Sequence, residues 1–199
     1  MNETSAPRLV TILCLLLGLG LAACSGGGEE PPLKGAAIGG PFALVDQDGR
    51  ATTDRDFAGR YRIMYFGFTH CPDICPTDLA VLGQALRRFE TSDPARAARV
   101  TPIFVSVDPE RDSPAVLKEY VAAFHPRLVG LTGTPRQLAD MSRRYGAYYG
   151  KGAPTEGSGY DVNHSRLAEL IGPQGEPIAL LPYDKGAEAV AAELDRWVR

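Results

Sequence analysis

The sequence lacks the features that mark several common classes of protein. Its 199 residues carry a net charge of −3 and no basic run, which excludes an electrostatic case for nucleic-acid binding. It contains no Cys-x-x-Cys pair and no set of four regularly spaced ligands, so it has neither the usual disulfide-exchange motif nor a structural zinc motif. Cysteine and histidine are scarce, with 4 and 3 residues. The position of each one is therefore informative.

The amino-terminal segment has the pattern of a processed leader rather than of a membrane span. Arg8 is followed by an apolar stretch over residues 9–23, which is short of the roughly 20 residues that a membrane-spanning helix needs. The stretch ends in Leu-Ala-Ala before Cys24, which resembles the lipobox of bacterial lipoproteins. That resemblance implies a signal peptide over residues 1–23 and lipidation of Cys24. An uncleaved anchor helix is the alternative, and both interpretations tether the remaining chain to a membrane, outside the cytoplasm.

The next segment is rich in glycine and proline and has no apolar periodicity. We therefore predict that residues 24–40 form a lipidated, flexible tether that keeps the folded part close to the membrane. Residues 41–199 are enough for one ordinary core, so a single domain is predicted there. No other apolar run is long enough to span a membrane, which favours a soluble, monomeric domain once leader and tether are removed.

Strand and helix patterns alternate along this domain. Short apolar and aromatic runs predict strands, and apolar residues at helical spacing after start signals predict helices. The predicted strands cover residues 42–50, 61–68, 100–107, 128–131, 164–171 and 176–183. The predicted helices begin near residues 76, 114, 135 and 186, and a loop is predicted over residues 150–159. This order predicts an α/β sheet with helices on both faces.

Two cysteines follow the second predicted strand, in the stretch YFGFTHCPDICPTDL. Cys71 and Cys75 stand at the carboxyl end of a strand and the amino end of a helix. Open α/β sheets bind ligands in such places, and the helix dipole favours thiolate over thiol there. A disulfide between the two would close a very small loop and constrain the unfolded chain little. The two cysteines are therefore better explained by their reactivity than by a contribution to stability.

Four stretches in the same order resemble one protein family. YFGFTHCPDICPTDL, VSVDPERDSP, LVGLTG and YDVNHS are similar to motifs of the Sco/SenC family of copper-binding assembly factors for cytochrome c oxidase, within residues 36–199. The resemblance implies a thioredoxin-like fold, in which a central mixed β-sheet is flanked by helices and extended by an N-terminal strand hairpin. It also implies that Cys71, Cys75 and His164 are the metal ligands.

The donor atoms of these three residues agree with copper. Two thiolates and an imidazole form a soft, low-coordination set that suits Cu(I), whereas structural zinc has four protein ligands. The wider cysteine spacing would let both sulfurs turn toward one ion on the loop before the helix, while His164 closes the site from another loop. A redox-active disulfide between Cys71 and Cys75 is the alternative, since the spacing alone does not exclude it. Asn163 and Glu169 depart from the family pattern, which has an aspartate and an aromatic at those positions.

Other residues in these motifs have simpler interpretations. His70 is expected to be exposed or to lie behind the ligands, because neighbouring side chains at a strand end point apart. His125, at a predicted helix end before a proline, is interpreted as a residue favoured by the helix dipole. Asp73 is expected to be a solvated turn residue, since Cu(I) prefers softer donors than carboxylate. Residues 108–114 are predicted to be a charged loop with a helix start signal, and the resemblance places them at the rim of the metal face.

Two functions fit this set of residues. The first, implied by the resemblance, is a metallochaperone that binds copper as Cu(I), Cu(II) or both and supports assembly of the CuA centre in subunit two of cytochrome c oxidase. The second is a thiol-disulfide reductase that acts on that subunit or another extracytoplasmic protein. A thiol peroxidase is disfavoured, because Phe68 stands where such enzymes carry threonine or serine, three residues before the reactive cysteine. The expected location is the periplasm or the outer face of the cell membrane.

Overall fold

Strands from the whole length of the domain meet in the structure. It is a computed structural model that describes residues 29–152 and 159–199, and residues 31–199 form one compact unit. The strands are β1 (Ala43–Asp46), β2 (Ala51–Thr53), β3 (Tyr61–Gly67), β4 (Val100–Ser106), β5 (Val129–Thr132), β6 (Tyr149–Lys151), β7 (Val162–His164), β8 (Ala168–Ile171) and β9 (Pro177–Leu180). The helices are η2 (Asp54–Phe57), α2 (Ile74–Ser92), α3 (Pro94–Ala97), α4 (Pro114–Ala122), α5 (Pro135–Arg144), η3 (Tyr183–Lys185) and α6 (Ala187–Trp197).

Seven of these strands form one mixed sheet. Their order is β2-β1-β5-β4-β3-β8-β9, and β6 pairs with β7 in a separate two-stranded sheet. The pairs β3–β4 and β4–β5 are parallel, whereas β1–β2, β1–β5, β3–β8 and β8–β9 are antiparallel. The strands β1 and β2 form the N-terminal hairpin that the family resemblance implied, and Gly49 takes a positive φ of 79° in its turn. The predicted α/β architecture is confirmed.

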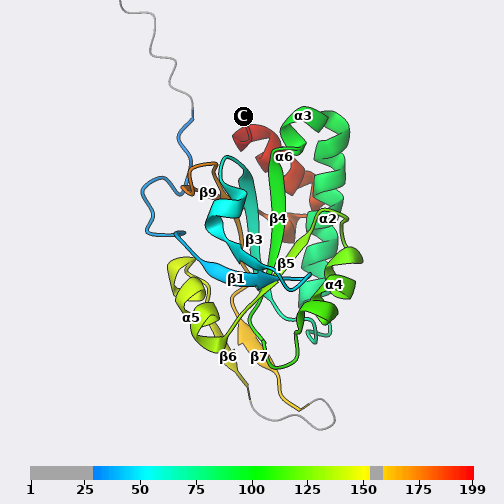
Figure 1. Ribbon diagram of the computed structural model, residues 1–199. Helices are drawn as coiled ribbons and strands as arrows, with labels where there is room; N and C mark the ends of the chain where they lie inside the picture. The colour runs from blue at the N-terminus through cyan, green and yellow to red at the C-terminus, as the bar shows by residue number, and fades with distance from the viewer. Residues whose placement is uncertain (1–28, 153–158) are drawn as a thin grey trace, which may run out of the picture. The chain divides into compact units, whose positions relative to one another are not determined.

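Helices cover both faces of the large sheet (Figure 1). On one face, the ring of Phe104 in β4 lies 6.3 Å from that of Tyr65 in β3 and 5.3 Å from that of Tyr120 in α4. On the other face, Phe66 of β3 contacts the ring of Tyr145, just after α5, at 5.9 Å. Successive strand residues point to opposite faces. The helices α2, α4 and α6 therefore share one face, and α5 covers the other.

The two central strands explain why the sequence forms this core. All seven residues of β3 and all seven of β4 are buried. Parallel strands with helices on both faces read as nearly continuous apolar runs rather than as alternating ones, which is the pattern that predicted them. Because β3 ends at Gly67, the chain leaves the core and enters the cysteine-bearing stretch within a few residues.

Some element boundaries differ from those predicted. The helix α2 begins at Ile74, so it starts before the second cysteine. The helix α5 ends at Arg144, because Gly146 takes a positive φ of 64° that stops the helix. The chain then forms β6, which takes up the first two residues of the predicted loop and pairs with β7. Residues 153–158 of that loop lie outside the described residues. The predicted strand over residues 164–171 is divided, since β7 ends at His164 and β8 begins at Ala168.

The segment before β1 belongs to the compact unit. The amide of Leu33 donates to the carbonyl of Ile178 at 3.0 Å, and the amide of Gly39 donates to the carbonyl of Arg144 at 2.8 Å. These hydrogen bonds hold the chain against β9 and the end of α5. The compact unit therefore begins at Pro31, rather than at residue 41 as the glycine and proline content suggested.

The predicted membrane attachment involves residues that lie outside this description. The signal peptide over residues 1–23 and the lipidation site Cys24 are not among the described residues. Among those that are described, no helix combines the length and the apolar character needed to cross a membrane.

Candidate metal centre

The two cysteines lie where the central strand meets helix α2. Cys71 is in the connecting loop, whereas Cys75 is in the first turn of the helix, so only one of the two is on the loop where both were expected. Both are free thiols, with exposed fractions of 8% and 0%. The amide of Cys75 donates to Sγ of Cys71 at 3.3 Å. The helix amino terminus thus holds the two sulfurs close together.

A buried carboxylate fixes the loop in front of Cys71. Asp112 is fully buried and accepts hydrogen bonds from the Thr69 amide at 3.0 Å, the Thr69 hydroxyl at 2.6 Å and the Ser106 hydroxyl at 2.6 Å. Charge-assisted bonds of this kind are among the stronger ones in proteins. His70, next in the chain, has an exposed side chain, and its ring nitrogen Nδ1 lies 3.1 Å from the Thr69 hydroxyl. It therefore borders the site, as expected.

His164 reaches the cysteines from the small sheet. It is the last residue of β7 and pairs with Tyr149 of β6. Its Nδ1 lies 3.1 Å from the carbonyl oxygen of Ser165, which can only accept, so Nδ1 carries the proton. The other ring nitrogen, Nε2, therefore offers its lone pair, and it lies 3.3 Å from Sγ of Cys75. The Phe68 ring packs edge-on against the imidazole, with 5.7 Å between centroids.

The structure brings together the three side chains that the family resemblance implied as ligands. Their candidate ligand atoms, the sulfurs of Cys71 and Cys75 and a ring nitrogen of His164, all lie within 4.8 Å of one another. Among the described residues, no fourth cysteine, histidine or carboxylate completes the group. This arrangement suits a soft ion of low coordination number and does not supply the closed four-ligand shell of structural zinc. Asp73 is exposed and outside the group, as expected.

Burial dominates the protonation of the candidate ligands. It raises the pKa of the Cys75 thiol to about 12, against the sequence expectation that the helix dipole would favour thiolate. The difference arises because the sulfur is enclosed by the core, where a charge loses its hydration. Burial also lowers the pKa of His164, which keeps the imidazole in the neutral form that binds metals. A metal ion that binds Cys75 would therefore have to displace the proton of its thiol.

An ion pair joins the helix that carries Cys75 to the segment after His164. Asp78 is buried in α2, and its Oδ1 lies 2.7 Å from a guanidinium nitrogen of Arg166. The Tyr65 hydroxyl also donates to Asp78, at 2.9 Å. The hydrogen bond and charge of Asp78 raise the pKa of Arg166 further. This ion pair therefore connects the helix of Cys75 to the segment that follows His164.

A cavity of about 230 Å³ lies beside the candidate ligands. Cys71 and His164 line it, and Ile74, 42% exposed, forms part of its wall. Arg166 lines the same cavity and is half-exposed. The site is therefore accessible from one side to a molecule in solution.

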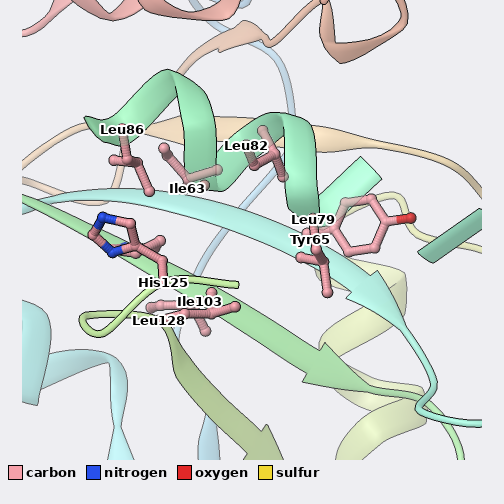
Figure 2. A pocket seen from close by; sticks show the side chains of 10 residues that line it. Ile63, Tyr65, Leu79, Leu82, Leu86, Ile103, His125 and Leu128 are labelled. Carbon is pink, nitrogen blue, oxygen red and sulfur yellow. The ribbon is translucent and has the colours of Figure 1, made fainter. Parts of the chain in front are cut away.

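A second, smaller cavity belongs to the core (Figure 2). It has a volume of about 10 Å³ and lies between α2 and the central strands, among residues such as Ile63, Leu82 and Leu128. His125 closes one end of it and is only 2% exposed, so it is a core residue rather than one placed by a helix dipole. Its Nδ1 accepts from the amide of Arg127 at 3.2 Å. An apolar space of this size is a packing defect and not a ligand site.

Sequence reasoning missed the residues that support the three candidate ligands. Asp112 was interpreted only as part of a charged loop with a helix start, and Ser113 does cap α4 as that interpretation predicted. Asp78 and Arg166 had no assigned role. An aspartate within an otherwise apolar helix face was the signal for Asp78, since a buried carboxylate requires a partner.

Fold and site together define a class of protein: a thioredoxin-like α/β domain in which a histidine faces two free thiols. A solved thioredoxin domain of a thiol-disulfide oxidoreductase from Bacteroides vulgatus shares the fold at a TM-score of 0.55, with 15% identity, covering 81% of this chain and 96% of that one. A family model described as SCO1/SenC matches residues 30–199. The chain belongs to this family.

Known members of the family resemble the chain over most of its length. The human protein SCO2 homolog, mitochondrial, is 47% identical over 165 residues, which is 82% of this chain. The crystal structure of Arabidopsis thaliana ScoI with copper bound has a TM-score of 0.75 and 38% identity, covering 80% of this chain and 97% of that one. The chain spans less than two thirds of the length of such curated relatives, 61% in the human case.

Proposed function

We propose that this protein is a copper-binding assembly factor that supports formation of the CuA centre in subunit two of cytochrome c oxidase. The observation that carries the proposal is the grouping of Cys71, Cys75 and His164, with their ligand atoms within 4.8 Å of one another. Membership of the SCO1/SenC family and the copper-bound relative from Arabidopsis thaliana support it. Copper is the cargo in this proposal and not a resident cofactor.

The geometry suggests how the chain would hold and release its cargo. The two sulfurs lie at the junction of β3 and α2, and they would bind as thiolates. His164 would bind through Nε2, since Nδ1 donates to the carbonyl of Ser165. Its hairpin is a separate small sheet, so the imidazole is the ligand that can withdraw with least disturbance of the core. The adjacent cavity admits an acceptor's ligands from that side.

The proposal includes attachment of the folded unit to a membrane, outside the cytoplasm. It rests on the leader over residues 1–23 and on Cys24, which carry the lipoprotein pattern in the sequence. We propose that the folded unit acts as a monomer held there by lipid on Cys24. Replacement of Cys24 by alanine should abolish incorporation of labelled fatty acid, and unchanged labelling would overturn the lipid anchor while leaving the copper site untested by that result.

A thiol-disulfide reductase is the second candidate function. Two free thiols, the first of them beside an open cavity, favour it. The raised pKa of Cys75 makes this thiol a poor nucleophile near neutral pH, so in a reductase Cys71 would have to attack first. The two functions also assign different roles to His164. It is a metal ligand in the copper-binding factor, whereas in the reductase it only lies next to the thiols.

The test compares His164→Ala with Cys71→Ser. Both variants of the full chain would be titrated with Cu(I) and Cu(II) against competing chelators, and tested for restoring oxidase activity in a deletion strain. We expect Cys71→Ser to lose both copper states, and His164→Ala to bind Cu(I) more weakly and Cu(II) hardly at all, because Cu(II) favours nitrogen donors. Wild-type copper binding by His164→Ala, with oxidase activity lost only in Cys71→Ser, would favour the reductase.

A further inference from the structure

One short loop contacts both sides of the candidate metal centre. Residues 108–112, between β4 and α4, carry the Asp-Pro-Glu-Arg-Asp sequence. Its last residue, Asp112, binds the amide and hydroxyl of Thr69 and so fixes the cysteine-bearing loop. Its other charged residues face the hairpin that carries His164. The loop is therefore placed to set the distance between the two halves of the site.

Arg111 makes the main contact with the hairpin. Its side chain is only 16% exposed, and its Nε forms an ion pair with Asp108, which is itself buried. Another of its guanidinium nitrogens donates to the carbonyl oxygen of Tyr160 at 3.0 Å. Its central guanidinium carbon also lies 3.9 Å from the centre of the Tyr160 ring. Arginine thus engages this one residue through both backbone and ring, which its planar fork allows and a lysine could not reproduce.

Tyr160 makes two more contacts in the same region. Its hydroxyl donates to Oδ1 of Asp108 at 2.6 Å. The ammonium of Lys151 in β6 lies 3.9 Å from the ring centre and also donates to Glu110 at 2.8 Å. Cation–ring contacts are strongest where the cation is shielded from water. The base of the hairpin is therefore tied to the 108–112 loop by several contacts at one residue.

These contacts are directed at the position of the imidazole. Tyr160 lies two residues before the hairpin strand β7, and the strand pairing then fixes Val162 opposite Lys151 and His164 opposite Tyr149. The guanidinium carbon of Arg111 also lies 5.8 Å from the centre of the Phe68 ring, the ring that packs edge-on against His164. Arg111 thus contacts both the segment that leads into the strand of the imidazole and the ring that packs against it.

We propose that Arg111 is a positioning residue for His164, acting through Tyr160 and Phe68, and that it sets where the imidazole stands relative to the two sulfurs. The inference rests on the proposed copper site. Since Asp112 holds the cysteine loop, adjacent residues of one loop place the nitrogen ligand and the sulfur ligands independently. Loss of the Arg111 contacts lets the hairpin and imidazole move, while the sulfurs keep their places. Cu(II), which depends on the nitrogen ligand, is affected more than Cu(I).

The experiment uses Arg111→Ala, Arg111→Lys and a matched control, Arg96→Ala, in the full chain. Arg96 also pairs with an aspartate three residues earlier and lies 5.3 Å from the centre of the Phe89 ring, but far from the candidate ligands in α3. Arg111→Ala should lower Cu(II) affinity by about 10- to 100-fold, as removal of a ligand's supporting contact does. Its effect on Cu(I) affinity should be several-fold smaller, and its thiolate-to-Cu(II) absorption band should shift.

The control and the conservative variant separate positioning from stability. Arg96→Ala should lose stability yet bind both copper states as wild type does. Arg111→Lys should recover part of the Cu(II) affinity, because an ammonium keeps the charge near the ring but not the bond to the Tyr160 carbonyl. Wild-type Cu(II) affinity and absorption in a folded Arg111→Ala protein would overturn the proposal.

Two further measurements distinguish this proposal from the proposed function. In the background of His164→Ala, which still binds Cu(I), Arg111→Ala should cause no additional loss of Cu(I) affinity, because the residue acts through the missing imidazole. A loss that remains in that background would contradict the proposal. In the metal-free protein, the His164 ring resonances should shift in Arg111→Ala and stay in place in Arg96→Ala. That result tests the positioning even if the wild-type protein binds no copper, and unshifted resonances would refute it.

Discussion

The two halves of the candidate metal centre are held in different ways. Cys75 is fully buried where a seven-residue central strand meets a nineteen-residue helix, so its position is part of the core. His164 ends a three-residue strand of a two-stranded sheet, in which Val162 is the one buried residue. A two-stranded sheet is marginal by itself, so the hairpin depends on contacts with its surroundings.

The difference teaches how a site can combine a fixed and an adjustable ligand. Packing in the core fixes the sulfurs, and changes there are expected to cost stability as well as binding. Polar and cation–ring contacts at the hairpin base fix the nitrogen, and these can be weakened one at a time.

The largest effect is expected from Gly67→Ala, at the end of β3. A Cβ at this position would lie 2.9 Å from Sγ of Cys75, 3.0 Å from the Phe104 ring and 3.1 Å from the Tyr65 ring. None of these groups can withdraw easily in a packed core, so the change should cost about 1–3 kcal/mol of stability. Displacement of the Cys75 sulfur should also weaken binding of both copper states. Urea unfolding and competitive copper titration measure the two effects.

Gly83→Ala is the matched control for this change. Its Cβ would lie 2.7 Å from the carbonyl oxygen of Phe124, so it should destabilise the same helix, α2, by overpacking. The position is remote from the sulfurs, and copper affinity of the folded protein should stay at the wild-type level. Equal losses of copper affinity in Gly67→Ala and Gly83→Ala would show that helix stability, and not the place of the sulfur, controls binding.

The sequence predicted the fixed half of this site better than the adjustable half. Continuous apolar runs identified the central strands, and Cys71 was placed correctly between strand and helix, whereas Cys75 lies in the first turn of the helix. The hairpin was missed because β6 and β7 have only three residues each, too few to show alternation, and because the helix pattern before them extends past Gly146. Only the family resemblance singled out His164.

The supporting contacts were harder still to predict. Arg111 and Tyr160 are 49 positions apart in the sequence, and Asp78 and Arg166 are 88 apart. Such pairs depend on how the strands are ordered in the sheet, which the spacing of residues along the chain does not specify. The expected thiolate at Cys75 was mispredicted for a related reason, since the helix dipole is a local effect whereas the burial that raises the pKa of this thiol comes from the whole core.

An intermediate effect is expected from Asp78→Asn, which alters the contact between the halves. The amide can still accept from the Tyr65 hydroxyl, but it no longer pairs in charge with Arg166. Loss of one partner of a buried charged hydrogen bond costs about 1–3 kcal/mol, and less here because Arg166 is half-exposed. The segment after His164 should loosen and Cu(II) affinity should fall by less than in Arg111→Ala. An unchanged Cu(II) titration would show that the ion pair between Asp78 and Arg166 does not support the metal centre.

The smallest effect on the metal centre is expected from Glu169→Gln, which tests the strand beyond the hairpin. Glu169 is fully buried in β8, where the family pattern has an aromatic, and neither of its carboxyl oxygens has a hydrogen-bond partner among the described residues. By strand register, Arg62 of β3 shares its sheet face, and Tyr145 is the other ionisable neighbour there. Burial raises the pKa of the Glu169 carboxyl from the ordinary 4.5 to about 8.

The sign of the resulting pH dependence follows from proton binding. Between pH 4.5 and about 8 the folded protein holds the Glu169 proton, whereas the unfolded chain releases it. The free energy of unfolding contributed by this residue therefore falls as pH rises through that range, by up to about 1.4 kcal/mol per pH unit.

Glutamine cannot ionise, so Glu169→Gln should remove this slope. The stability of the variant relative to the wild type should therefore increase as pH rises from 5 to 8, with copper affinity unchanged. Urea unfolding at several pH values measures the slope, and parallel wild-type and variant curves would mean that the carboxyl is solvated or paired in solution. A change in copper affinity would instead show that β8 is coupled to the histidine hairpin, and the division between a fixed and an adjustable half would have to include that strand.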